Sequence, residues 1–359
     1  MKSSKEGNLL RLIAIFLVAV TIVLTIGFAA DGWQGATDNI QNNNNNQENT
    51  GDSIPTPPRI PDFLSPLTGL EISETQASMR QICYVINSFE AMYGLSSSSL
   101  TVEIPTENGE TRVLAYIDEN VTVEPKIGSI TKTRDYISNI ASFFGGLLIS
   151  AGNDDTIQYS SIDVSDSVID LLGHVGYYYT ENEKSIYTNK NLIEALLTAK
   201  GVSLKKTEAI QSPFNFTPYH DNPIKSSELA RTICIEYSSD NTTKLSYSAD
   251  GEYTISKNGN NIIDTKTGKF VSYENVFVLF ADATTYERIN GIQTIVDTQT
   301  SGLGYYFTEG TKYNIRWYCD DAGSLVFLND SGVKLTVNRG CSYIAYQKAS
   351  MYDKIIIES

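Results

Sequence analysis

The sequence contains few of the residues on which metal and nucleophilic chemistry depend. Its 359 residues include only two histidines, His174 and His220, and four cysteines, with no Cys-x-x-Cys pair. Structural zinc needs four such ligands at close spacing, and triad catalysis needs a histidine beside the nucleophile. The aspartates within 154–166 lack the spacing of an EF-hand loop, so a solvated acidic face is the simpler interpretation. We therefore expect no metal, no cofactor and no nucleophilic triad.

The sequence also lacks a basic stripe. Its 27 Lys and Arg against 42 Asp and Glu give a formal net charge of −15. Nucleic-acid binding depends on clustered basic side chains that neutralise phosphates, and no such cluster follows the N-terminus. Residues 63–359 alone carry 23 basic and 36 acidic side chains. We therefore expect no nucleic-acid partner, and the acidic body favours neutral or cationic partners.

Only one long hydrophobic run is present. Residues 12–30 contain no charged side chain, and a helix of that length is close to the roughly 30 Å thickness of the hydrocarbon core. Basic residues precede the run, and the next one is Arg59. The positive-inside rule then predicts a cytoplasmic stub at 1–11 and a single-pass anchor in the cell membrane, with the rest of the chain extracytoplasmic.

A cleaved signal peptide is the alternative interpretation of this run, because Gly27 and Ala29 are small residues of the kind found at cleavage sites. Both interpretations export the same body. Residues 31–62 follow, rich in Asn and Pro, and such a composition buries too little apolar surface to fold. The sequence therefore predicts a disordered tether between the membrane and the body.

The exported body is expected to be an α+β protein in two parts. The first, a mixed α/β domain at 63–211, is predicted from periodicity and capping signals. Its expected strands are 81–86, 112–117 and 147–150, and its expected helices are 134–144 after a Thr133 cap, 164–172, and 192–200 after an Asn191 cap.

A proline-containing linker at 212–228 is expected to separate this domain from a mostly β domain at 229–359. The second domain is predicted from short alternating segments between Asn, Asp and Gly turns. Its expected strands are 231–237, 243–248, 252–256, 275–280, 303–308, 312–318, 324–328 and 342–346.

Several short blocks follow one another in a distinctive order. They are S-P-L-T-G-L at 65–70, V-I-N at 85–87, G-L-S-S-S-S-L-T-V-E at 94–103, E-N-G-E-T-R at 107–112, I-G-S-I-T-K-T-R at 127–134, G-L-G-Y-Y-F at 302–307, Trp317 and N-R-G at 338–340. In combination, residues 65–348 resemble the YerB-like family of bacterial envelope lipoproteins. The resemblance implies two linked domains whose biochemical activity is unknown.

The chain departs from the family pattern at several positions. Family members commonly carry a lipid-modified cysteine after the signal, whereas the first cysteine here is Cys83, inside the body. A helical anchor is therefore expected to replace the lipid. Ser99, Thr131 and Phe89 stand where the family usually has Asp, Arg and His, which weakens any site that those residues form.

The cysteines leave two states open. Cys83, Cys234, Cys319 and Cys341 all lie in predicted strands. Export permits disulfides, and Cys319 with Cys341 is one pairing between neighbouring strands. Buried free thiols are the equal alternative, because a body of this size needs no covalent link to fold.

The polar residues kept in the family-like blocks are the candidate ligand-binding residues: Asn87, Glu103, Glu107, Arg112 and Arg134. Glu103 and Glu107 have the chemistry of a glycosidase acid–base pair, and the two arginines that of an anion clamp. The alternative is a set of internal salt bridges that support the turn between Glu103 and Arg112. The aromatic residues of 305–307, Trp317 and Tyr343 suit a sugar-stacking platform or, more simply, a β-domain core.

The function that these observations favour is a noncatalytic binding or scaffolding module of the cell envelope, with envelope proteins or wall components as partners. Two alternatives remain. One is a cell-wall or carbohydrate hydrolase that uses Glu103 and Glu107. The other is a solute receptor with an interdomain site near 212–227.

Overall fold

The computed structural model describes residues 59–87, 93–117, 126–152, 168–181, 185–206, 212–288 and 291–359. Contacts divide the chain into units 1–57 and 58–359, and all of the described residues belong to the second unit. Within the described ranges, no helix is long and apolar enough to cross a membrane. The predicted anchor at 12–30 lies outside those ranges and stays a prediction.

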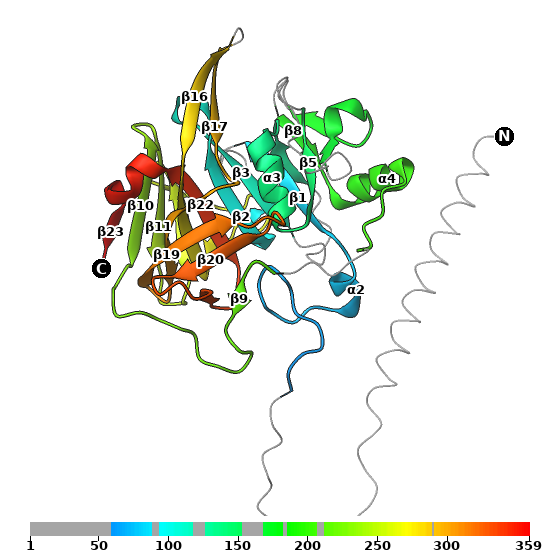
Figure 1. Cartoon of the computed structure of the whole chain (residues 1–359). Helices are drawn as coiled ribbons and strands as arrows, with labels where there is room; N and C mark the ends of the chain where they lie inside the picture. The colour runs from blue at the N-terminus through cyan, green and yellow to red at the C-terminus, as the bar shows by residue number, and fades with distance from the viewer. Residues whose placement is uncertain are drawn as a thin grey trace, which may run out of the picture. The chain divides into compact units, whose positions relative to one another are not determined.

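One large mixed sheet forms the centre of the molecule (Figure 1). Its 13 described strands include a path in the order β20 (Leu325–Asn329), β19 (Thr311–Cys319), β18 (Ser301–Thr308), β15 (Asn275–Ala281), β22 (Ser342–Lys348), β2 (Ser98–Pro105), β3 (Thr111–Ile117), β1 (Gln81–Asn87), β4 (Ile127–Ile130), β8 (Ser185–Thr188) and β7 (Tyr179–Glu181). Off this path, β5 (Gly146–Ser150) pairs with β1, and β6 (Val168–Asp170) pairs with β5. The sheet therefore contains strands from both halves of the sequence.

The two halves meet where β22 lies between β15 and β2. It runs parallel to both, with Ser342 opposite Asn275 on one side and opposite Leu100 on the other. The predicted division into 63–211, 212–228 and 229–359 stays a prediction. The structure adds that hydrogen bonds between strands cross from the first of these segments to the last.

A second sheet packs against the first. Its order is β13 (Asn260–Asn261), β12 (Tyr253–Lys257), β11 (Asn241–Tyr247), β10 (Thr232–Ser238) and β23 (Ile356–Glu358), with β14 (Ser272–Tyr273) beside β12. Two small pairs complete the described strands: β16 (Ala283–Arg288) with β17 (Gly291–Val296), and β9 (Asn215–Phe216) with β21 (Thr336–Val337). Figure 1 shows the β16–β17 hairpin projecting from the body.

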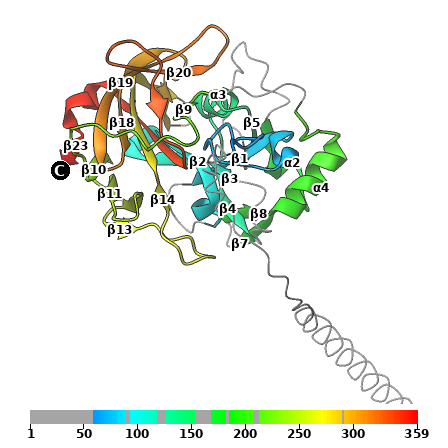
Figure 2. The same cartoon turned by 90° about the horizontal axis from the view of Figure 1, so that it is seen from below.

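The described α-helices are few and short: α2 (Glu74–Ala77), α3 (Asp135–Phe143) and α4 (Lys190–Lys200). Helix α4 begins where the Asn189 side chain accepts a hydrogen bond from the Leu192 amide, and it ends at Gly201 in the left-handed conformation. Figure 2 shows α4 on one side of the described body and β10, β11 and β13 on the other.

Alternation along the strands gives the large sheet two apolar faces. Val113 and Ala115 belong to a core that includes residues of the second sheet and of α4. Leu114 and Tyr116 belong to a second core, which includes the buried side of α3. The large sheet is thus a middle layer, with the second sheet and α4 packed on one face and α3 on the other.

Most predicted strands are confirmed, but the predicted proportion of helix to strand is not. The described residues are mostly β with few helices, rather than a mixed α/β domain followed by a mostly β one. The helix predicted at 164–172 is wrong over residues 168–172. Val168–Asp170 forms a strand beside β5, and a 3-10 turn follows it. The spacing of apolar residues in this segment favours a helix, but pairing with the edge of the sheet stabilises a strand instead. Residues 164–167 lie outside the described ranges.

Candidate functional site

Glu103 lies in β2, on the face of the large sheet that the second sheet covers, and is 0% exposed. Its Oε1 accepts hydrogen bonds from Thr111 Oγ1 at 2.6 Å and Lys257 Nζ at 2.5 Å. Its Oε2 accepts from Thr243 Oγ1 at 2.8 Å and from the Tyr343 hydroxyl. Four protein donors therefore hydrogen-bond to this carboxylate. Such a carboxylate links the two sheets and does not face a substrate.

The groups around Glu103 form one polar cluster within the apolar core. Lys257 also donates to Thr243 Oγ1 at 2.8 Å and lies 4.9 Å from the centre of the Tyr237 ring. Burial raises the pKa of Tyr343, and the adjacent Glu103 carboxylate raises it further. The phenol therefore stays protonated at neutral pH and can donate to Glu103.

Glu107 and Arg134 form a second, separate ion pair. Glu107 begins the 3-10 turn η2 (Glu107–Gly109) between β2 and β3, and the Arg134 guanidinium at the N-cap of α3 donates to its Oε1. Beside them, the Tyr136 hydroxyl donates to the Pro105 carbonyl at 3.3 Å. Burial raises the pKa of Tyr136 to about 12. This pair joins the E-N-G-E-T-R block to the I-G-S-I-T-K-T-R block.

Asn87 and Arg112 are neighbours across the antiparallel pair of β1 and β3. Asn87 is exposed at the end of its strand. The Arg112 guanidinium donates to the Lys132 carbonyl at 2.8 Å. The structure thus brings Asn87 together with Arg112 and Glu107 together with Arg134, but it does not bring Glu103 and Glu107 together as an acid–base pair.

The family-like blocks at the two ends of the body also meet. The Gly340 amide donates to the Thr68 carbonyl at 2.9 Å, and the Arg339 guanidinium donates to the Gly69 carbonyl. Gly69 has φ +67°, and a Cβ there would lie 2.7 Å from the Phe216 ring. These turns hold together segments that are distant in the sequence.

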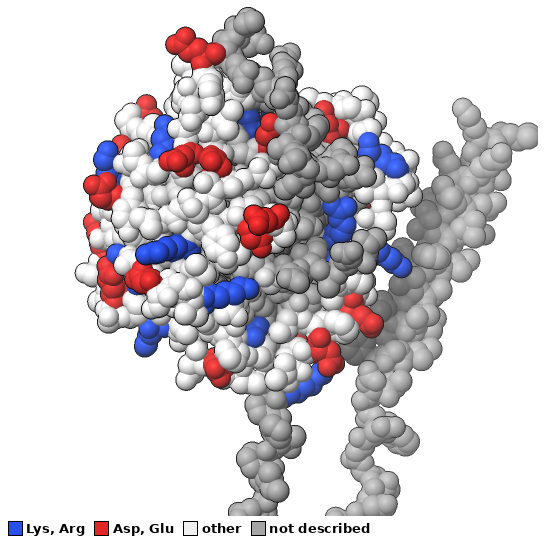
Figure 3. All heavy atoms as spheres, in the orientation of Figure 1, with Lys and Arg blue, Asp and Glu red and all other residues white. Residues whose placement is uncertain are grey.

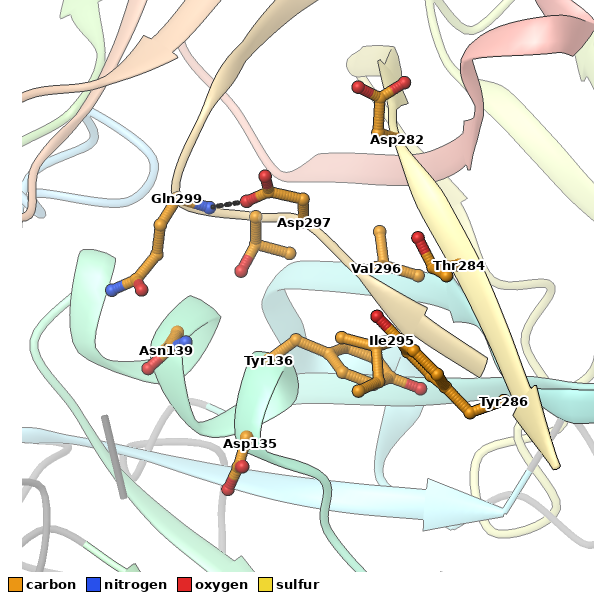
Figure 4. Close-up of a pocket in the computed structure, with 11 residues that line it drawn as sticks. Asp135, Tyr136, Asn139, Asp282, Thr284, Tyr286, Ile295, Val296, Asp297 and Gln299 are labelled. Atoms are coloured by element: carbon orange, nitrogen blue, oxygen red, sulfur yellow. Dashed lines mark hydrogen bonds between the residues drawn. The ribbon is translucent and has the colours of Figure 1, made fainter. Parts of the chain in front are cut away.

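An open cavity of about 480 Å³ lies between α3 and the β16–β17 hairpin (Figure 4). The helix contributes Asp135, Tyr136 and Asn139. Both Tyr136 and Asn139 are buried against the body. This volume is within the range of about 300–1,000 Å³ that is typical of small-molecule sites.

The hairpin supplies the opposite wall. Thr284 lies directly opposite Ile295 in the register of β16 and β17, so the two side chains share a face, as does that of Tyr286 two positions along. Tyr286 is 46% exposed and Ile295 37% exposed. Figure 4 shows both side chains extending toward Tyr136 of α3. The cavity thus has an aromatic and aliphatic lining on its hairpin side.

Polar groups border this apolar lining. Asp297 accepts a hydrogen bond from the backbone amide of Gln299 at 3.1 Å. The Gln299 side chain points toward the helix that carries Asn139 (Figure 4). Asp282 and Asp135 lie at opposite ends of the view. None of the described residues that line the cavity is basic. Within the described part of the chain, no three His, Cys, Asp or Glu side chains are placed to hold a metal ion.

Sequence reasoning missed both the cavity and the partner of Glu103. The cavity depends on the β16–β17 hairpin, which was not predicted, although T-T-Y-E-R and G-I-Q-T-I-V have strand-forming residues around a short turn. The sequence contained one signal for Lys257. It lies two positions after Ile255 and four after Tyr253, so the alternation along β12 places it on the same buried face as those two residues. The aromatic residues at 305–307, Trp317 and Tyr343 are buried, which confirms the core interpretation.

All four cysteines lie in the described ranges, and none of them forms a disulfide. On the face shown in Figure 3, acidic and basic side chains are interspersed over a largely uncharged surface. The aspartates at 154, 155, 163 and 166 lie outside the described residues, as does Phe89.

The architecture is that of a mostly β protein in which one sheet joins two sequence domains. Residues 67–203 match the N-terminal domain, and residues 233–344 the C-terminal domain, of the family described as "Protein of unknown function (DUF3048)". The chain belongs to this DUF3048, YerB-like family.

Two comparisons with individual proteins agree with this assignment. The chain is 24% identical over 266 residues to YerB of Bacillus subtilis (strain 168), whose name calls it a candidate lipoprotein, covering 70% of this chain and 77% of that protein. The crystal structure of YerB protein from Bacillus subtilis matches with a TM-score of 0.70 at 20% identity, over 83% of this chain and 100% of that one. The structural match shows a shared fold.

Proposed function

We propose that this protein is a membrane-anchored, extracytoplasmic binding protein of the cell envelope that works without catalysis. The uncharged run at 12–30, preceded by basic residues, supports the anchor and the orientation. The similarity to YerB, a candidate lipoprotein by its name, supports a location at the outer face of a membrane. The tether at 31–62 would give the body reach from that surface.

The cavity between α3 and the β16–β17 hairpin carries the proposal of binding. It is open, it exposes Tyr286 and Ile295 to solvent, and its walls come from the two family domains. Ligand sites commonly lie where two such parts meet. The solute-receptor alternative thus becomes a form of the same proposal, although residues 212–227, where the sequence placed its site, do not line this cavity.

The hydrolase alternative has less support. Glycosidic cleavage needs two carboxylates that face the same bond, about 5–10 Å apart. Glu103 is instead occupied by four donors inside the core, and Glu107 binds Arg134 at the start of α3 on the other side of the sheet. The arrangement favours recognition of a ligand over its cleavage.

The test of location uses the full-length chain in cells. Alkaline extraction of membranes should leave the protein in the pellet, and protease added outside should degrade residues 63–359. Release of the chain as a soluble protein that lacks residues 1–30 would instead support a cleaved signal peptide.

The test of binding uses the same chain in detergent and a thermal-shift screen. A ligand at 100 times its Kd adds about 2.7 kcal/mol to the free energy of unfolding and raises the midpoint by several degrees. Each hit is then incubated with the protein and examined for chemical change. Turnover of a bound compound would contradict the noncatalytic proposal.

A further inference from the structure

The lining of the cavity between α3 and the β16–β17 hairpin points to one class of ligand, and we propose that this cavity binds a neutral, hydroxyl-rich saccharide. The inference rests on the proposed binding function and assigns its ligand chemistry. Three properties of the lining carry it: its charge, its apolar surface and the kinds of hydrogen-bonding groups it contains.

The charge of the lining disfavours anions. Asp135, Asp282 and Asp297 line the cavity, and none of the described lining residues is basic. A phosphate or carboxylate would therefore meet like charge with no compensating cation. The carboxylates of Asp135 and Asp282 also lie at opposite ends of the view in Figure 4 and point away from each other, so they form no single point for a compact cation. Acceptors spread in this way suit a ligand whose hydroxyl donors are spread as well.

The apolar part of the lining is already formed and exposed. Tyr286 and Ile295 project from one face of a two-stranded sheet, and both stay partly exposed to solvent. An aromatic ring presents a flat apolar face together with a polar edge. The C–H face of a pyranose ring can lie against such a surface while its hydroxyls reach the polar rim.

The hydrogen-bonding groups of the lining include one that is unsatisfied. Thr298 lines the cavity and is 2% exposed, and its hydroxyl has no hydrogen-bond partner among the described residues. Buried hydroxyls are rarely left without a partner, so this group is suited to receive a ligand hydroxyl. Nearby, the amide side chain of Gln299 points toward the helix that carries Asn139 (Figure 4). Carboxylate, amide and hydroxyl groups bordering an aromatic surface match the donors and acceptors of a sugar.

The experiment compares four probes on the full-length chain in detergent: triacetylchitotriose, maltotriose, spermidine and inorganic phosphate. Binding is measured by calorimetry for the wild type, for Tyr286→Ala, for Thr298→Val and for Tyr318→Ala. Tyr318 is the matched control, because it is 36% exposed and lies on β19, outside the cavity. Circular dichroism and the thermal midpoint of each variant show whether it is folded.

We expect at least one trisaccharide to bind the wild type. Tyr286→Ala should weaken that binding about tenfold, the loss of one aromatic contact, and Tyr318→Ala should leave it within about twofold. Thr298→Val should also weaken it, since the variant removes the hydroxyl and keeps the shape. The two trisaccharides separate an N-acetylated sugar from a plain one as the preferred form.

Three results would overturn the saccharide inference. One is binding of neither trisaccharide; another is saccharide binding that Tyr286→Ala leaves unchanged; a third is Tyr286-dependent binding of spermidine or phosphate alone. In that last case the proposed binding function stands while its ligand class changes. If no probe binds, a photo-crosslinking residue at position 286 decides the proposed function separately, because capture of an envelope component supports it and an empty crosslink contradicts it.

Discussion

The ammonium group of Lys257 lies 2.5 Å from a carboxylate oxygen of Glu103, although the two residues are 154 positions apart in the chain. Glu103 belongs to the large sheet and Lys257 to the second sheet. Both side chains are buried, and hydroxyl groups of Thr111, Thr243 and Tyr343 supply the remaining donors. The contact between the sheets therefore contains a charged pair inside an otherwise apolar core.

Replacing Lys257 alone should be strongly destabilising. Lys257→Met removes the positive charge and leaves the Glu103 carboxylate buried without its counter-ion, which typically costs about 3–5 kcal/mol. The measurement is urea unfolding of the wild type and the variant at neutral pH.

The matched control for this prediction is the double variant Glu103→Leu with Lys257→Met. Because it removes both charges, it should recover much of the stability lost by Lys257→Met. A double variant no more stable than Lys257→Met would show that the pair is not the source of the loss.

Substitution of Gly302 should test how closely two strands of the large sheet approach. A Cβ on Gly302 would overlap the Phe280 carbonyl oxygen and lie 2.7 Å from Trp317 Nε1. Gly302→Ala should therefore destabilise the fold by about 1–3 kcal/mol or more, as overpacking does. A Cβ on Gly173 would meet no atom within 4 Å, so Gly173→Ala should change the thermal midpoint little. Equal effects of the two substitutions would contradict the steric explanation.

Alkaline pH should weaken the fold because several phenols are buried. Burial raises the pKa of Tyr136 from 10.0 to about 12 and raises those of Tyr273 and Tyr306 as well. The folded state holds these protons more tightly than the unfolded state. The stability they contribute is fully present below about pH 10 and is lost as the pH rises through the folded values. For Tyr136 alone this amounts to about 2–3 kcal/mol.

Urea midpoints at pH 8, 9.5 and 11 measure this loss. The wild-type midpoint should change little up to pH 9.5 and fall clearly by pH 11. Tyr136→Phe, which cannot ionise at that position, should fall less steeply. A midpoint that stays constant to pH 11 would show that the phenols are not buried as described.

The thiols should differ in reactivity. Cys83 is 0% exposed, and burial raises its pKa, so its thiolate is scarce and shielded. Cys319 is only partly buried. Iodoacetamide at pH 8 should therefore label Cys319 much faster than Cys83 in the folded chain, as mass spectrometry of peptides would show. In 8 M urea the two rates should converge, and rapid labelling of Cys83 without urea would contradict its burial.

Local patterns predicted most individual elements. The alternation of Ile315, Trp317 and Cys319 with polar neighbours placed β19 correctly, and the apolar residues at 136, 137, 140 and 141 predicted α3. Such patterns depend on neighbours a few positions away, which is why a single sequence carries them. Cap positions shifted, however, from Thr133 to Arg134 and from Asn191 to Asn189.

The candidate site depended on long-range contacts that a single sequence does not show. Glu103 and Glu107 are four positions apart, yet they bind Lys257 and Arg134 in different parts of the molecule. The interpretation of these residues as internal salt bridges agrees with that geometry. The cavity needed both the unpredicted β16–β17 hairpin and its placement beside α3, and neither follows from periodicity.

The position of β22 has a consequence for the order in which the chain can fold. This strand is made after β2 and β15, yet it fills the gap between them in the middle of the large sheet. Because the chain is made from its N-terminus, the edge of β2 stays exposed until residues 342–348 arrive. Pairings of such high sequence separation form slowly, so the emerging chain would need protection from aggregation until β22 is inserted.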